Sequence, residues 1–111
     1  YASAQEYADA VQAAAELLQK ELPGANIVVS SILPAQEIAC QKQKLWRQIP
    51  DYSAAVGQMC AENGILFADN TALCDEHGDL WQADGIHLFP QFYPYWAANL
   101  LIASWGEAAD A

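Results

Sequence analysis

The stretch Asp84-Gly85-Ile86-His87 contains the residues whose types and spacing best suit chemistry. An Asp three residues before a His, on a turn tightened by Gly, can point its carboxylate at the imidazole Nδ1. That hydrogen bond fixes the tautomer and leaves Nε2 free to take a proton from a nucleophile. The spacing therefore predicts two of the three members of a hydrolytic triad. Such short matches also arise by chance, and the competing interpretation is an Asp and a His that stabilise their own turn.

The third member of such a triad, an activated Ser or Cys, is not recognisable in the sequence. Ser30 and Ser31 are best placed, near the end of a predicted strand, yet they lack the flanking glycines of a sharp nucleophile turn. We interpret them as strand serines that bond to nearby backbone. Cys74, beside His77 or His87, would serve as a nucleophile only with a lowered thiol pKa. The missing nucleophile predicts part of an enzyme rather than a whole one.

Other side chains around this stretch allow two further interpretations. Trp81 and Phe89 lie on either side of the Asp-His turn, where they could line an acyl or sugar pocket or simply cover the core. Asp69, which closes a predicted strand, is interpreted as a loop-stabilising carboxylate. Several potential metal ligands are close in sequence, but their spacing matches no zinc pattern, so we expect a polar loop without metal or cofactor: Cys74, Asp75, His77, Asp84 and His87.

Length and charge limit the classes of protein to which the chain can belong. Its 111 residues suffice for one small domain, and 54% hydrophobic residues provide a core. A net charge of −10, with four basic against fourteen acidic residues, argues against a nucleic-acid partner, which requires clustered Lys and Arg. The one basic cluster, Lys42, Lys44 and Arg47, is interpreted as a solvated face. No apolar run approaches the roughly 20 residues of a membrane span. The start at Tyr1 is interpreted as a cut end.

Hydrophobic periodicity and turn residues predict helices that alternate with strands. The expected helices cover residues 1–22, 50–63 and 90–105, and the expected strands cover 27–33 and 65–68. Residues 35–49 are ambiguous, 70–88 are expected to form the loop that carries the Asp-His pair, and 106–111 a frayed tail. The apolar stripe of the first helix consists of Tyr7, Val11, Ala14, Leu18 and Leu22.

Both predicted strands are apolar without alternation, which is typical of parallel strands covered on both faces. This order predicts an α/β fold with right-handed crossovers. A parallel sheet of only two strands leaves an open edge and is a poor candidate for independent stability. We therefore expect further strands from elsewhere to complete it.

The three cysteines are interpreted from their predicted positions. Cys60 lies on an apolar helical stripe and is expected to be a small core residue. Cys40 and Cys74 follow the two predicted strands, in loops that would emerge at the same edge of the sheet. A disulfide between them is therefore a hypothesis.

The segment Asp84-Gly85-Ile86-His87-Leu88, followed by Tyr93 and Trp96-Ala97, resembles the last motif block of the SGNH (GDSL-type) hydrolases. Residues 62–69 and 23–30 also resemble the strands, and the helix end, that precede this block in the family. The resemblance implies the C-terminal part of a flavodoxin-like three-layer α/β/α sandwich with parallel strands. It also implies a serine hydrolase acting on acyl esters of carbohydrate or lipid, with His87 as general base and Asp84 as its partner.

The chain departs from the family pattern in its missing blocks. The Gly-Asp-Ser block with the nucleophile, the oxyanion Gly and the Gly-x-Asn-Asp block do not occur, and Phe89 and Phe92 replace residues that are usually small. Residues 1–111 are therefore predicted to be a partial domain, catalytically inert alone, whose partner is the missing N-terminal half. The alternative is a non-catalytic module that pairs with a second copy through its exposed strand edge.

Overall fold

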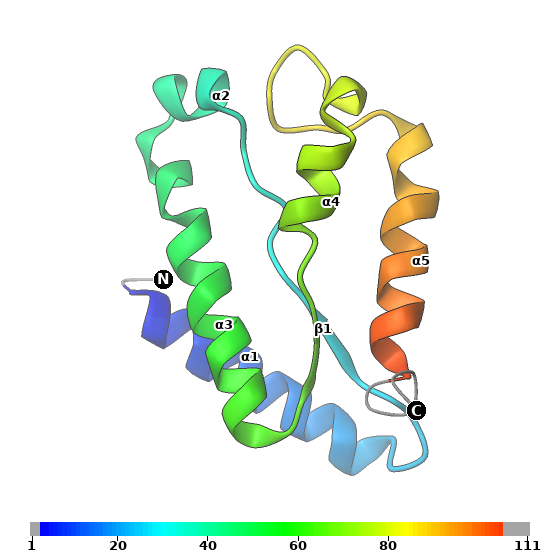
Figure 1. The fold of residues 1–111 in the computed structure, drawn as a ribbon. Coiled ribbons are helices and arrows are strands. Elements are labelled where there is room, and N and C mark those ends of the chain that lie inside the picture. Colours follow the sequence, from blue (N-terminus) through cyan, green and yellow to red (C-terminus); the bar gives the residue numbers. More distant parts are fainter. Residues whose placement is uncertain (1–2, 106–111) are drawn as a thin grey trace.

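Two short parallel strands with helices on both sides organise the chain in the computed structural model, which describes residues 3–105 (Figure 1). Strands β1 (Val28–Ser30) and β2 (Leu66–Ala68) pair in parallel, with Val29 opposite Phe67. The helices are α1 (Ala4–Glu21), α2 (Glu37–Lys42), α3 (Ile49–Asn63), α4 (Thr71–Glu76) and α5 (Tyr93–Ser104). Short 3₁₀ turns are η1 (Lys44–Gln48), η2 (Gly78–Leu80) and η3 (Pro90–Phe92). The predicted α/β class and the parallel pairing are confirmed.

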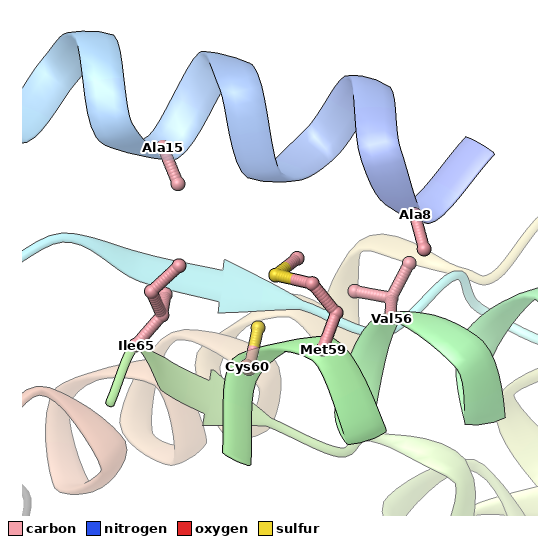
Figure 2. Packing of buried hydrophobic residues seen from close by; sticks show 6 residues of the cluster. All are labelled: Ala8, Ala15, Val56, Met59, Cys60 and Ile65. Carbon is pink, nitrogen blue, oxygen red and sulfur yellow. The ribbon is translucent and has the colours of Figure 1, made fainter. Parts of the chain in front are cut away.

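The main core lies between α1, α3 and one face of the strands. Small residues on α1 allow α3 to approach, and Figure 2 shows side chains of α3 directed toward them. The buried residues of this cluster are Ala8, Ala15, Val56, Met59, Cys60 and Ile65. Val29 and Phe67, which are opposite each other in the sheet, pack against it. Burial of these apolar side chains is what fixes α1 and α3 on this face.

The predicted stripe of α1 is only half correct. Tyr7 and Val11 pack against the core, but Leu18 and Leu22 are exposed. The carboxyl half of α1 finds no neighbour among the described residues that could cover these leucines. The helix begins at Ala4, after a Ser3 cap that no sequence pattern was used to predict: the Ser3 hydroxyl accepts a hydrogen bond from the Glu6 N–H at 3.1 Å.

A second, smaller core supports the opposite side of the molecule, where α5 lies (Figure 1). Its buried residues are Cys74 of α4, Phe92 of η3 and Leu88, which directly follows His87. The single turn η3 precedes α5, whose first turn contains Pro94. No residue of α5 is fully buried, although the helix is strongly apolar.

Several predicted boundaries are wrong. Residues 70–88 were expected to be irregular, yet they contain α4, which is too short to show a helical period. The first strand is shorter than the predicted 27–33, because the Ile32 N–H leaves the sheet to bond the Ser53 hydroxyl at 3.1 Å. The ambiguous segment 35–49 contains α2 and η1. The predicted tail, 106–111, lies outside the described residues. Within residues 3–105, no helix combines the length and hydropathy needed to span a lipid bilayer.

The hypothesis of a disulfide between Cys40 and Cys74 is wrong. Both residues lie in helices, α2 and α4, rather than in loops, and all three cysteines are free and buried. Cys60 is fully buried in the main core, as predicted.

We expect three thiols to react with Ellman's reagent in the denatured, non-reduced protein, and to react slowly in the folded protein because all three are at most 6% exposed. A count of one thiol under denaturing, non-reducing conditions would show that two cysteines are paired.

Candidate active site

The Asp84 carboxylate contacts His87 through both of its oxygens. Oδ2 lies 2.5 Å from the ring Nδ1, and Oδ1 accepts hydrogen bonds from the backbone N–H groups of Ile86 and His87, each at 3.0 Å. The predicted Asp-His contact is confirmed. Asp84 stabilises its own turn as well, so the competing interpretation describes part of the same geometry.

The imidazole of His87 is available to a partner. Its side chain is 68% exposed, and Nε2 has no hydrogen-bond partner among residues 3–105. The contact to Nδ1 favours the tautomer in which Nε2 is unprotonated and can accept a proton. Such a ring can accept a proton at Nε2 while the carboxylate holds it in position.

Hydrogen bonds hold the pKa of the Asp84 carboxyl well below its usual range. The largest contribution is the bond with the His87 side chain, followed by the backbone N–H groups of Ile86 and His87. Asp84 is therefore an anion at neutral pH. An ionised carboxylate can only accept hydrogen bonds, so the ring N–H is the donor in the contact with His87.

The loop that carries the pair is closed at its base by backbone hydrogen bonds. The Gln82 N–H donates to the His87 carbonyl and the Phe89 N–H to the Leu80 carbonyl, each at 2.8 Å. Trp81 and Leu88 form an antiparallel bridge between these two bonds. Leu88 is buried in the second core, so the turn is anchored immediately beside His87.

Gly85 is required where the turn meets α2. Its φ is +74°, and its carbonyl accepts a hydrogen bond from the Gln36 N–H at 2.8 Å. A Cβ at this position would lie 2.7 Å from Cγ2 of Ile38. The turn therefore needs glycine both for its backbone conformation and for the close approach of α2. No pattern in the sequence predicts this contact, because α2 lies almost fifty residues before the turn.

A buried polar network, which no sequence pattern predicted, joins the carboxyl ends of the strands to α5. Asn70 is fully buried, and its Nδ2 donates to the Ser30 hydroxyl at 2.9 Å. Its N–H donates to the Ser31 hydroxyl at 2.8 Å, and its Oδ1 accepts from Asn99 at 2.6 Å. The Ser30 hydroxyl also donates to the Ser31 carbonyl at 3.0 Å, so both hydroxyls bond to nearby backbone, as predicted. Ser30 is the last residue of β1, whereas Ser31 lies one residue beyond the strand. The Asp69 carboxylate accepts from the first N–H of α4 at 3.0 Å and stabilises the loop, as predicted.

The remaining predicted candidates are Cys74, His77 and the two aromatic residues that flank the turn. Cys74 is 1% exposed, and burial raises the pKa of its thiol to about 11, which excludes it as a nucleophile at neutral pH. His77 stacks on Tyr95, with ring centroids 4.0 Å apart. Trp81 packs against the second core and so covers it, whereas Phe89 is 44% exposed. A substrate-binding role for either aromatic stays a prediction. No cluster of potential metal ligands occurs within residues 3–105.

Two hollows lie near α3 rather than at the Asp-His pair. One, of about 290 Å³, is lined by residues such as Ile32, Pro34 and Phe67. The other, of about 270 Å³, lies between α2 and η1, where Arg47 and Glu37 form a bidentate ion pair at 2.7 and 3.0 Å. Neither is lined by Asp84, His87 or the flanking aromatics. The ion pair with Glu37 offsets the charge of Arg47, which belongs to the basic cluster, at the surface.

No protein-family model and no curated protein matches the chain. Among solved structures, the esterase domain of the ZfL2-1 ORF1 protein from the zebrafish ZfL2-1 retrotransposon is similar, with a TM-score of 0.74 at 20% sequence identity. The match covers 91% of this chain and 62% of that chain, so the chain spans less than two thirds of the neighbour's length. At this identity the likeness shows the fold alone, which is α/β.

Substitution of Gly85 by Ala should destabilise the fold more than the same change at Gly64. Gly64 has a similar φ of +65° but no atom within 4 Å of the place that a Cβ would occupy, so Gly64→Ala measures conformational strain alone, about 1–2 kcal/mol. Gly85→Ala adds the collision with Ile38. Urea denaturation of both variants gives the comparison, and equal losses of unfolding free energy would contradict the close packing of α2.

Replacement of His87 by Ala should raise the pKa of the Asp84 carboxyl, because it removes the largest of the interactions that lower it. The two backbone N–H bonds remain, so the pKa should stay below the ordinary value. The lowered pKa of Asp84 stabilises the folded state at pH values above about 3.9, which is the pKa of the carboxyl in the unfolded chain. This stabilisation is lost as the pH falls through the lower pKa of the folded state. Carboxyl ¹³C NMR titration measures the change, with His77→Ala as the matched control. An unchanged Asp84 titration in His87→Ala would show that the ring contact is absent in solution.

Proposed function

We propose that this chain is the C-terminal portion of a serine ester hydrolase of the SGNH type, completed by an N-terminal portion into a flavodoxin-like α/β/α sandwich. The observation that carries the proposal is the contact between Asp84 Oδ2 and His87 Nδ1, with Nε2 exposed. The esterase domain with a similar fold supports the proposal, as does the D-G-I-H motif. Acyl esters of carbohydrate or lipid are the proposed substrates.

In this proposal His87 moves the proton and Asp84 stabilises its charge. As the serine Oγ of the N-terminal portion bonds to the acyl carbon, Nε2 takes the hydroxyl proton. The resulting imidazolium gives this proton to the departing alcohol oxygen when the ester C–O bond breaks. Water then gives a proton to the same nitrogen as its oxygen bonds to the acyl carbon. The bond between the acyl carbon and Oγ breaks, Nε2 returns the proton to Oγ, and the acid leaves. Asp84 remains ionised throughout, because its lowered pKa keeps it from taking the proton.

The described residues explain why the chain alone should be inert. The hydroxyls of Ser30 and Ser31 are committed to the buried network, and Ser31 is only 5% exposed. The Cys74 thiol is buried and protonated. A base without a nucleophile cannot form an acyl intermediate, so activity requires a serine from outside residues 1–111.

Hydrolysis of p-nitrophenyl acetate tests this function. The 111-residue chain should give no turnover above buffer, whereas a polypeptide extended by the residues encoded upstream should be active. In that polypeptide His87→Ala and Asp84→Asn should each lower kcat by on the order of 10³–10⁴-fold. Asp79→Asn, an exposed carboxylate in η2, is the matched control and should leave kcat unchanged. Turnover by the 111-residue chain that disappears in His87→Ala, or an extended polypeptide without activity, would refute the proposal.

A further inference from the structure

The outer edge of β1 carries backbone groups that the sheet does not pair. The Ser31 N–H donates to the Ala68 carbonyl at 2.9 Å, so Ser31 faces β2. Alternate residues of a strand direct their backbone N–H and C=O groups to opposite sides. Val29 therefore also faces β2, whereas the backbone groups of Val28 and Ser30 face away from it. Within residues 3–105, no strand lies on that side.

The position of α1 indicates what belongs at this edge. α1 and α3 pack against each other on the same face of the strands. α3 connects β1 to β2, and parallel crossovers of this kind are right-handed in about 98% of cases. α1 lies on the same face as α3 and leads into β1. If α1 itself follows a parallel strand, the same handedness places that strand beside β1, on the side away from β2. That side is the open edge.

Exposed apolar side chains lie near the carboxyl ends of α1 and α5. α1 and α5 lie on opposite sides of the strands (Figure 1). Near their carboxyl ends, four large side chains are between 45% and 64% exposed: Leu18, Leu22, Leu101 and Ile102. The Asn26 amide donates to the Ser104 carbonyl at 2.9 Å, which holds the end of α5 next to the segment entering β1. A strand added at this edge would place apolar residues between the two helices.

We propose that a parallel β-strand from the polypeptide upstream of residue 1 docks along β1 at Val28 and Ser30, between the exposed leucines of α1 and α5. The inference rests on the proposed function for the existence of that upstream portion. The similar esterase domain also has residues beyond the part that this chain matches, because this chain covers 62% of it. A second copy is disfavoured at this edge, because two chains of net charge −10 repel each other.

Amide hydrogen exchange, followed by NMR, tests the docking. In a polypeptide extended upstream, the amides of Val28 and Ser30 should exchange as slowly as those of Val29 and Ser31. In the 111-residue chain they should exchange on the order of a hundredfold faster than in the extended polypeptide. Fast exchange at Val28 and Ser30 in the extended polypeptide would overturn the proposal. Protection in the 111-residue chain that grows with protein concentration would also overturn it, because a second copy would then occupy the edge.

Two proline variants give a matched comparison. Val28→Pro removes a donor from the outer edge only, and prolines are tolerated at such positions. It should lower the urea midpoint of the extended polypeptide and leave that of the 111-residue chain unchanged. Val29→Pro removes a donor to β2 and should lower both midpoints. Equal effects of Val28→Pro on the two polypeptides would contradict an added strand.

The exchange experiment is independent of ester cleavage. An extended polypeptide that protects Val28 and Ser30 but cleaves no ester would refute the proposed function and leave the docking intact. An active polypeptide in which these amides exchange fast would refute the docking alone.

Discussion

A single carboxylate determines the shape of the candidate site. One oxygen of Asp84 accepts two backbone N–H groups and thereby forms the turn, and the other contacts the imidazole. Shaping the turn and orienting the ring thus depend on the same ionised group. The turn is tight, and Gly85 permits it by adopting a positive φ. A hydrogen bond from the Gln36 N–H, at the start of α2, to the Gly85 carbonyl holds the turn in place. The exposed ring is therefore held by its own turn rather than by burial.

The second constraint is that parallel strands require cover on both faces, and that an open strand edge leaves backbone groups unpaired. β1 and β2 have helices on either side, but the described residues supply only one strand neighbour to each. The upstream strand that we propose would cover the exposed leucines of α1 and part of the apolar surface of α5. The buried cluster between α1 and α3 is sufficient to place the two strands in register.

The sequence predicted those features that local patterns encode. The D-x-x-H spacing predicted the ring contact, and unbroken apolar runs predicted the parallel pair. It did not predict the network around Asn70, because a polar residue after a strand looks like an ordinary loop residue until its partners, Ser30 and Asn99, are brought together. Nor did it predict α4, whose six residues are fewer than two helical turns. The predicted spacing of apolar residues along α1 was correct, but only part of that stripe is buried. Burial depends on neighbouring elements, which periodicity does not reveal.

The formation of the Asp-His turn and its placement in the fold depend on different contacts. Asp84 and His87 are three residues apart, so their contact closes a very short loop and costs little chain entropy. The Gly85 carbonyl instead accepts a hydrogen bond from the Gln36 N–H, 49 positions away. Contacts of such high sequence separation slow folding, so the turn can form early while its position in the fold is set late. The Asp-His contact is in this sense a local peptide property, and its position is a property of the whole topology.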